Sequence, residues 1–227
     1  MVVGHGKQMI QPGQIIILNG VPRSGKSSIV KVIQETFDGP WMNLGVDVFK
    51  ERIIPRRYSP AIGLRPGGEA PDLEPLIVVL FAAMYESIAA HSRLGLNVVV
   101  DVGHHDNYSA PRGILVDSAR RLSGLPVLFV GVRCPIETIL ERRRKTWGSG
   151  GSAEEPGLDL IQLWQREVHD PGIYDLEVDT SALSSEECAK EIQRWLGSGT
   201  RPSAFERLAR MTKVKAALSN PITKEIC

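Results

Sequence analysis

The stretch GVPRSGKS at residues 20–27 limits the possible folds of this chain more than any other feature. It directly follows the apolar run at residues 15–18 and matches the pattern G-x-x-x-x-G-K-[ST]. In such a loop, backbone N–H groups converge on a bound phosphate where a helix begins. With 22 glycines in 227 residues, we put a chance match somewhere in the chain at roughly 1%. We therefore predict a loop that joins a strand to a helix and binds ATP or GTP.

The residues of this loop have distinct expected roles. Gly20 lets the chain turn out of the strand, and Gly25 lets the backbone approach the phosphates closely. Lys26 is placed to reach the β- and γ-phosphates and to assist catalysis, and Ser27 is placed to bind Mg²⁺ through its hydroxyl. The predicted cofactor is thus a nucleoside triphosphate, ATP or GTP, with Mg²⁺. The predicted nucleotide-binding residues are Gly20, Val21, Pro22, Arg23, Ser24, Gly25, Lys26, Ser27 and Ser28.

Short β-branched runs alternate with longer helical patterns along the chain. Strands are expected over residues 14–18, 41–46, 97–101, 127–132 and 176–178. Helices are expected over residues 26–37, 73–94, 109–122, 136–145, 158–168 and 184–196. This alternation predicts an α/β fold of the P-loop NTPase and kinase type. We expect a three-layer sandwich, in which helices cover both faces of a parallel sheet of about five strands.

Several segments depart from this alternation. Residues 55–75 are rich in Pro and Gly, which predicts a loop or flap. Residues 146–157 contain GSGG and acidic neighbours, which predicts a mobile lid. We divide the chain into an N-terminal extension at 1–13, a kinase domain at 14–196 and a basic tail at 197–227. A peripheral helix or frayed end is the favoured interpretation of the tail, ahead of a partner site.

Composition narrows the class of protein. A net charge of +1 gives no support to a binder of nucleic acid or of membrane surfaces. No apolar stretch is expected to span a bilayer, and no signal peptide is evident at the start of the sequence. The three cysteines form no C-x-x-C pair, which favours a reducing compartment. A cytoplasmic protein is therefore expected, and a homo-oligomer is compatible with these features.

Two carboxylates are placed to meet the nucleotide. Asp101 ends the apolar run at 98–100, where an acidic residue of a P-loop fold binds Mg²⁺ or substrate. Its alternative role is that of a cap or turn residue. Asp47 follows the expected second strand, so it would emerge at the same sheet edge as the loop. It could accept the proton of an attacking hydroxyl and contact the acceptor, or it could cap the helix that follows.

Arginines and a histidine are further candidates. Arg142, Arg143 and Arg144 are consecutive on a helix, so at most one or two can face the site. We select Arg142 and Arg143 as the residues that would neutralise charge on the transferred phosphoryl group. The pair His104 and His105 lacks the spacing of a metal site, and His104 is expected to contact substrate.

Sequence elements in a fixed order also resemble a known family. They are IILNG…SGKSSIV, then PW…GVD, then GVRC at 131–134, and then VHD…YDLEVDTS ending at 181. These elements are similar to those of the chloramphenicol phosphotransferase-like family of P-loop kinases, over about residues 15–196. The resemblance implies ATP-dependent phosphorylation of a hydroxyl on a small molecule. It implies that Asp47 is the base, that Lys26 and Ser27 act on the nucleotide, and that Asp101 is the carboxylate of the third strand.

The sequence departs from the family pattern where an acceptor would bind. Residues 102–106 read VGHHD, the Pro-rich segment 55–75 differs, and the lid carries Trp147 and GSGG in place of an arginine-bearing sequence. The resemblance therefore implies phosphotransfer like that of a chloramphenicol phosphotransferase, and antibiotic resistance is one role that it implies. It does not identify the acceptor.

Two other functions compete with this interpretation. One is a nucleotide, sugar or cofactor-precursor kinase of the same fold, which the acceptor pocket would distinguish. The other is a regulatory ATPase that binds a protein through the basic tail. The absence of an N-K-x-D guanine motif and the presence of the GVD carboxylate argue against a nucleotide-dependent switch.

Overall fold

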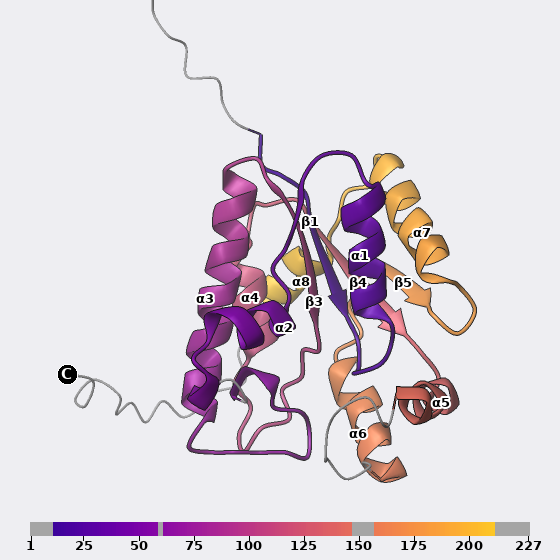
Figure 1. Ribbon diagram of the computed structural model, residues 1–227. Coiled ribbons are helices and arrows are strands. Elements are labelled where there is room, and N and C mark those ends of the chain that lie inside the picture. Colours follow the sequence, from indigo (N-terminus) through magenta and orange to yellow (C-terminus); the bar gives the residue numbers. More distant parts are fainter. Residues whose placement is uncertain (1–10, 59–60, 147–156, 212–227) are drawn as a thin grey trace, which may run out of the picture.

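The computed structural model describes residues 11–58, 61–146 and 157–211, and its centre is a parallel sheet (Figure 1). The strand order is β2-β3-β1-β4-β5, and every pairing is parallel. The strands are β1 (Ile15–Asn19), β2 (Trp41–Asn43), β3 (Asn97–Val102), β4 (Val127–Arg133) and β5 (Leu176–Asp179). The predicted five-stranded parallel sheet is confirmed.

Helices cover both faces of this sheet, as the continuous apolar strands require. Ile15 and Ile17 of β1 face one layer, and Ile16 and Leu18 face the other. The first layer contains α3 (Glu74–Arg93), α4 (Ile114–Arg121) and α8 (Ala204–Arg210). The second layer contains α1 (Lys26–Thr36) and α7 (Ser185–Gly197), which lie side by side in Figure 1. The three-layer sandwich follows directly from this alternation.

Two further helices lie beyond the carboxyl ends of the strands (Figure 1). They are α5 (Ile136–Thr146) and α6 (Leu158–Val168), and residues from both form a third apolar cluster that includes Trp164. Residues 147–156 of the expected lid fall between them and lie outside the described residues. The cluster places α6 above the edge of the sheet where the glycine loop emerges.

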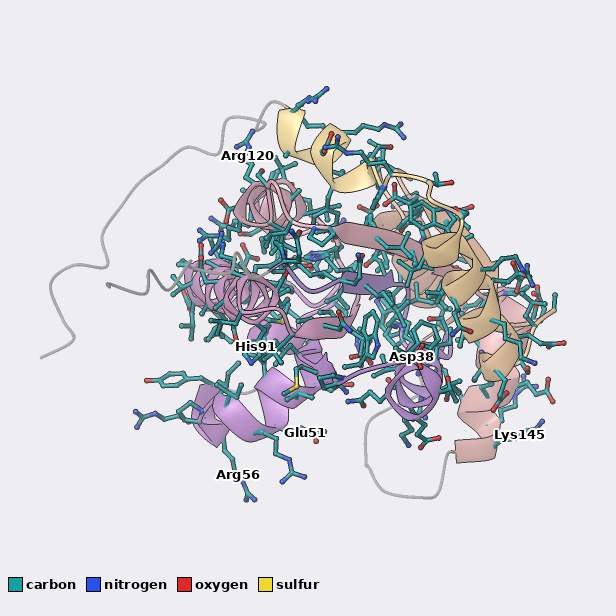
Figure 2. All side chains as sticks on the ribbon, turned by 90° about the horizontal axis from the view of Figure 1, so that it is seen from above. Asp38, Glu51, Arg56, His91, Arg120 and Lys145 are labelled. Atoms are coloured by element: carbon teal, nitrogen blue, oxygen red, sulfur yellow. The ribbon has the colours of Figure 1, made fainter. Side chains whose placement is uncertain are left out.

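The segment between β2 and α3 consists of short turns. It contains α2 (Val46–Val48), the π-helical turn η1 (Phe49–Ile53), and the 3₁₀ turns η2 (Arg56–Tyr58) and η3 (Ala61–Gly63). Glu51 and Arg56 point away from the body of the molecule (Figure 2). We call residues 61–68 the flap, because they return across the end of the sheet.

Two expected elements have different limits in the structure. The strand expected over 41–46 ends at Asn43, because the Asn43 side chain accepts the Gly45 N–H at 3.0 Å and turns the chain. The helix expected over 109–122 begins only at Ile114. The Asp106 carboxylate accepts the N–H groups of Arg112 and Gly113 at 2.7 and 2.8 Å, which holds the preceding residues in a loop.

The fold continues past the expected domain end at residue 196. Helix α8 buries Ala204, Phe205 and Leu208 against the sheet. Arg120 of α4 reaches the end of α8 and donates to the carbonyls of Ala209 and Met211 at 3.0 and 2.7 Å (Figure 2). The first part of the tail assigned to 197–227 thus contains a helix that packs on the core, whereas residues 212–227 lie outside the described residues.

One described helix, α3, is long and apolar enough by length and composition to cross a membrane, although the sequence analysis expects none. Its 20 residues include the fully buried Glu74, and Ile77, Tyr85 and Ile88 pack in the same core cluster as β1 and β3. The length and apolar composition of α3 are also those of a core helix of a folded domain.

Candidate active site

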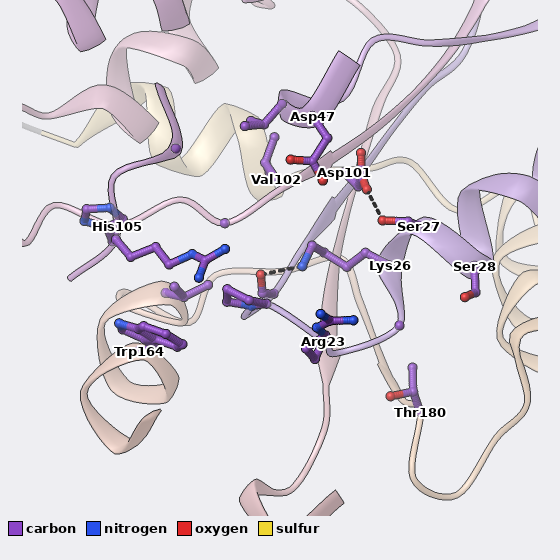
Figure 3. Close-up of a pocket in the computed structure, with 18 of the residues that line it drawn as sticks. Arg23, Lys26, Ser27, Ser28, Asp47, Asp101, Val102, His105, Trp164 and Thr180 are labelled. Carbon is purple, nitrogen blue, oxygen red and sulfur yellow. Dashed lines mark hydrogen bonds between the residues drawn. The ribbon is translucent and has the colours of Figure 1, made fainter. Parts of the chain in front are cut away.

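A cavity of about 870 Å³ lies at the carboxyl edge of the sheet, where ligands bind in open α/β folds. The glycine loop forms its floor, and residues 180–186 line one end. The other end is lined by residues from α2, the flap, the loop after β3, and α6. Asp47, Asp101 and Lys26 point into this space from three separate elements (Figure 3).

The Lys26 side chain folds back onto the glycine loop. Gly25 takes a left-handed conformation, φ 95°, at the start of α1, which a residue with a Cβ adopts at a cost. The Lys26 ammonium donates to the carbonyls of Gly20 and Val21 at 2.8 Å each. Burial lowers the pKa of Lys26 to about 8, and the carboxylates of Asp101 and Asp47 oppose this shift. The loop is therefore held ready for a phosphate by a buried cation.

Ser27 and Asp101 form the pair that fits Mg²⁺. The Ser27 hydroxyl donates to Asp101 Oδ2 at 2.6 Å. A Cβ at Gly45 would lie 1.8 Å from Asp101 Oδ1, so glycine at this position leaves room for the carboxylate. No group of three His, Cys, Asp or Glu side chains gathers anywhere in the described residues. A hydroxyl beside one carboxylate suits Mg²⁺ in a nucleotide site, because that ion needs few protein ligands and keeps waters and phosphate oxygens.

Asp47 is on the acceptor side of the cavity. It is the second residue of α2, while Gly45 occupies the cap position and makes no side-chain cap bond. The alternative role as a helix cap is therefore not the one that the structure gives it. Its carboxylate faces the same space as Asp101, across from Lys26 (Figure 3). This is the position from which a carboxylate can accept a proton beside a phosphate.

The two candidate arginines separate in the structure. Arg142 lines the cavity, donating through Nη2 to the Thr180 carbonyl at 2.6 Å and through Nη1 to the Thr180 hydroxyl at 3.0 Å and the Arg23 carbonyl at 3.2 Å. It thereby connects the glycine loop to the segment after β5. Arg143 is buried, does not line the cavity, and places its guanidinium 5.2 Å from the ring centre of Trp164. Arg143 thus packs against α6 through Trp164.

His104 is not placed on the cavity wall. It is 1% exposed, its Nε2 is 2.6 Å from the Tyr85 hydroxyl, and its ring packs against Phe81. Burial lowers its pKa to about 3, so the ring is neutral. The neighbouring His105 lines the cavity instead, next to Tyr108. Two adjacent histidines in a loop face different ways, and no periodicity indicates which of the two faces the cavity.

Most other residues that line the cavity could not be identified from the sequence. Arg65 and Pro66 come from the Pro-rich flap, where no periodicity indicates which side chains face inward. Trp164 lines the cavity although it is only 4% exposed, so it is both core and wall. Thr180, whose hydroxyl donates to the Ser24 carbonyl at 2.7 Å, lies within the YDLEVDTS element of the sequence. That element was the one available signal among these residues.

The parallel order β2-β3-β1-β4-β5, with the glycine loop and two carboxylates at its carboxyl edge, defines a P-loop kinase. A family model described as chloramphenicol phosphotransferase-like protein matches residues 13–196, and the chain belongs to this family.

Known relatives agree with this placement. The chain is 29% identical over 218 residues to a protein of Mycobacterium tuberculosis named "Putative O-phosphotransferase", over 87% of this chain and 88% of the relative. Among solved structures it resembles the APS kinase CysC of M. tuberculosis in complex with AMPPNP and APS, with a TM-score of 0.58 and 16% identity over 82% of this chain and 99% of that one. A tunicamycin resistance protein of Deinococcus radiodurans matches with a TM-score of 0.54 and 19% identity, over 82% and 96% of the two chains. These structures share the fold.

Proposed function

We propose that this protein transfers the γ-phosphoryl group of Mg·ATP to a hydroxyl of a small molecule, as a chloramphenicol phosphotransferase-like enzyme. The observation that carries the proposal is the position of Asp47. Its carboxylate faces Lys26 across the cavity, beside the Ser27–Asp101 pair (Figure 3). A base opposite a phosphate-binding loop is what transfer to a hydroxyl requires.

Each residue has a defined part in this reaction. Lys26 exchanges the carbonyls of the loop for phosphate oxygens, and Arg142 holds the loop against the segment after β5. Asp47 accepts the proton of the acceptor hydroxyl as its oxygen approaches phosphorus. Ser27 and Asp101 would hold Mg²⁺, which supplies charge neutralisation on the phosphate oxygens when bound.

The acceptor half of the cavity supports a small organic molecule. Its wall combines the aromatic rings of Phe81, Tyr108 and Trp164 with the carboxylate of Asp47. Aromatic walls with a few polar groups are typical of sites for such ligands. Chloramphenicol is the first acceptor to test, because the chain belongs to the family of that name. Other antibiotics, nucleosides, sugars and cofactor precursors complete the panel.

The test compares Asp47→Asn with the wild-type protein. We expect phosphorylated product, detected by mass spectrometry, from at least one acceptor of the panel. In Asp47→Asn, transfer should fall by about 10²- to 10⁴-fold, the usual effect of losing a general base, while ATP affinity is kept. Asp72→Asn is the matched control, because Asp72 is exposed and does not line the cavity. Acceptor-independent ATP hydrolysis that is the wild type's only activity and survives Asp47→Asn would contradict the proposal.

A further inference from the structure

Arg65 is a cation of the cavity that the proposed reaction has not yet used. It lies in the flap, and its side chain lines the cavity together with Asp47 and Lys26. Its guanidinium lies 5.2 Å from the ring centre of Trp164. Among the residues that the structure describes, none makes a hydrogen bond or ion pair with this guanidinium. Its five N–H donors are therefore directed to a ligand or to solvent.

The flap is anchored on both sides of Arg65. The Trp164 indole N–H donates to the Pro66 carbonyl at 2.8 Å, and His105 Nε2 lies 3.2 Å from the Leu64 carbonyl. The two anchored carbonyls belong to the residues immediately before and after Arg65. Because its backbone is held on both sides and its side chain rests on an indole ring, the guanidinium is oriented before any ligand arrives.

Arg65 lines the same cavity as Asp47 of the acceptor side and as Lys26 and Arg23 of the glycine loop. The Asp47 carboxylate attracts it, and Arg23 of the glycine loop repels it. Arg65 also adds to the positive field that Lys26 experiences. The same side chain thus lies within electrostatic range of the proposed base and of the phosphate-binding cations. A phosphoryl group that moves from the loop to a hydroxyl at Asp47 stays within the cavity that Arg65 lines.

The arginines of α5 are engaged elsewhere. Arg142 donates to the carbonyls of Thr180 and Arg23, and the buried Arg143 packs against the Trp164 ring. We propose that Arg65 is a catalytic residue, contacting the transferred phosphoryl group and neutralising the charge that spreads over its oxygens during transfer. This inference rests on the proposed phosphotransfer function, and it assigns to Arg65 of the flap the role that the sequence predicted for Arg142 and Arg143.

The chemistry of the step balances without another reactant. The bond between the γ-phosphorus and the bridging oxygen of ADP breaks, and a bond from phosphorus to the acceptor oxygen forms. The proton of that hydroxyl moves to Asp47, and ADP leaves with the bonding electron pair. Arg65 exchanges no proton in this step, because a guanidinium stays charged. Water can take the place of the acceptor hydroxyl. Arg65 should therefore contact the transferred phosphoryl group during slow ATP hydrolysis as well.

The experiment uses Mg·ADP with aluminium fluoride, which imitates the transferred group and needs no known acceptor. We expect the wild-type protein to bind Mg·ADP more tightly with fluoroaluminate than without it, as measured by calorimetry. Arg65→Ala should reduce this gain, and the kcat of slow ATP hydrolysis, by about 10²-fold or more. The affinities for Mg·ADP and Mg·ATP alone should change less than about threefold, because Arg65 acts on the charge of the transition state. Arg65→Lys should recover part of the loss, because it keeps the charge and loses the planar fork.

Arg57→Ala is the matched control. Arg57 lies 4.8 Å from the Tyr58 ring centre and does not line the cavity. Like Arg65, it belongs to the segment between β2 and α3. It should leave the fluoroaluminate gain unchanged. An unchanged gain in Arg65→Ala would overturn the role of Arg65 and leave the proposed function standing. A wild-type protein that neither hydrolyses ATP, phosphorylates an acceptor nor responds to fluoroaluminate would overturn both.

Discussion

Asp101 can occupy its position because Gly45 has no side chain. The carboxylate lies between the Ser27 hydroxyl and the Gly45 backbone, where a Cβ would come within 1.8 Å of Oδ1. The colliding atom is an oxygen of the functional carboxylate, so a side chain at this position could be accommodated only if the Asp101 carboxylate moved. The glycine of the GVD element therefore serves the carboxylate of the third strand, in addition to preceding Asp47.

Gly45→Ala should consequently act as a metal-site mutation. We expect the Asp101 carboxylate to rotate away from Ser27, raising the Mg²⁺ concentration needed for half-maximal ATP hydrolysis by about 10- to 100-fold, as loss of an orienting contact does. The measurement is a Mg²⁺ titration of activity at fixed ATP. Gly197→Ala is the control, since a Cβ there meets nothing within 4 Å. An unaltered Mg²⁺ dependence in Gly45→Ala would contradict this role of the glycine.

At the scale of elements, the strands could be predicted because each is an apolar run that both layers bury. Every residue of β1 is buried, so its continuous apolar run is enough to identify a strand covered on both faces. The segment between β2 and α3 could not be predicted to the same degree. Its short turns are fixed by contacts with distant residues, such as the bond from Trp164 to Pro66, 98 positions apart in the sequence. Arg65 was missed for this reason, and His104 was favoured over His105 for want of the same information.

Trp164 connects these elements, because it joins the flap to α6 while its ring supports Arg65. Trp164→Leu keeps an apolar side chain but removes the indole N–H and the aromatic ring. We expect the kcat of ATP hydrolysis to fall by about tenfold to 10²-fold, because a misplaced catalytic group has effects of that size. ATP affinity should change little, since the glycine loop is untouched. Steady-state kinetics of the purified variant provide the measurement.

Trp41→Leu is the matched control for this element. Trp41 is also buried, and its indole N–H also donates to a backbone carbonyl, that of Asp38 at 3.2 Å. It packs at the start of β2, in the cluster that contains α1 and α7, and does not line the cavity. Urea unfolding should show that both variants lose stability. If both also lost kcat equally, the effect of Trp164 would be a general loss of packing and its support of Arg65 would be refuted.

At the scale of the whole molecule, the folded unit extends beyond the family match at 13–196. Asp175, before β5, accepts the N–H groups of Ser203 and Ala204 at 2.7 and 2.9 Å through Oδ1. Its Oδ2 accepts the Phe129 N–H of β4 at 3.0 Å. One carboxylate thus fixes the start of α8 to the sheet. Basic residues alternate in the tail with the few apolar residues that α8 buries, so the sequence favoured a peripheral helix or frayed end over a helix packed in the core.

Leu208→Ala tests whether α8 belongs to the core. Leu208 is 0% exposed and packs in the cluster that includes β4 and Phe205. Its truncation should lower the free energy of unfolding by about 2–5 kcal/mol, the usual cost of a buried Leu→Ala change. Leu94→Ala is the control, since Leu94 is 67% exposed and surface changes usually stay within about 0.5 kcal/mol. Because α8 lies away from the cavity, both variants should keep the kcat of the wild type at temperatures where they are folded. Equal urea midpoints for the two variants would place α8 outside the cooperative core, whereas a selective loss in Leu208→Ala would extend the kinase domain to residue 210.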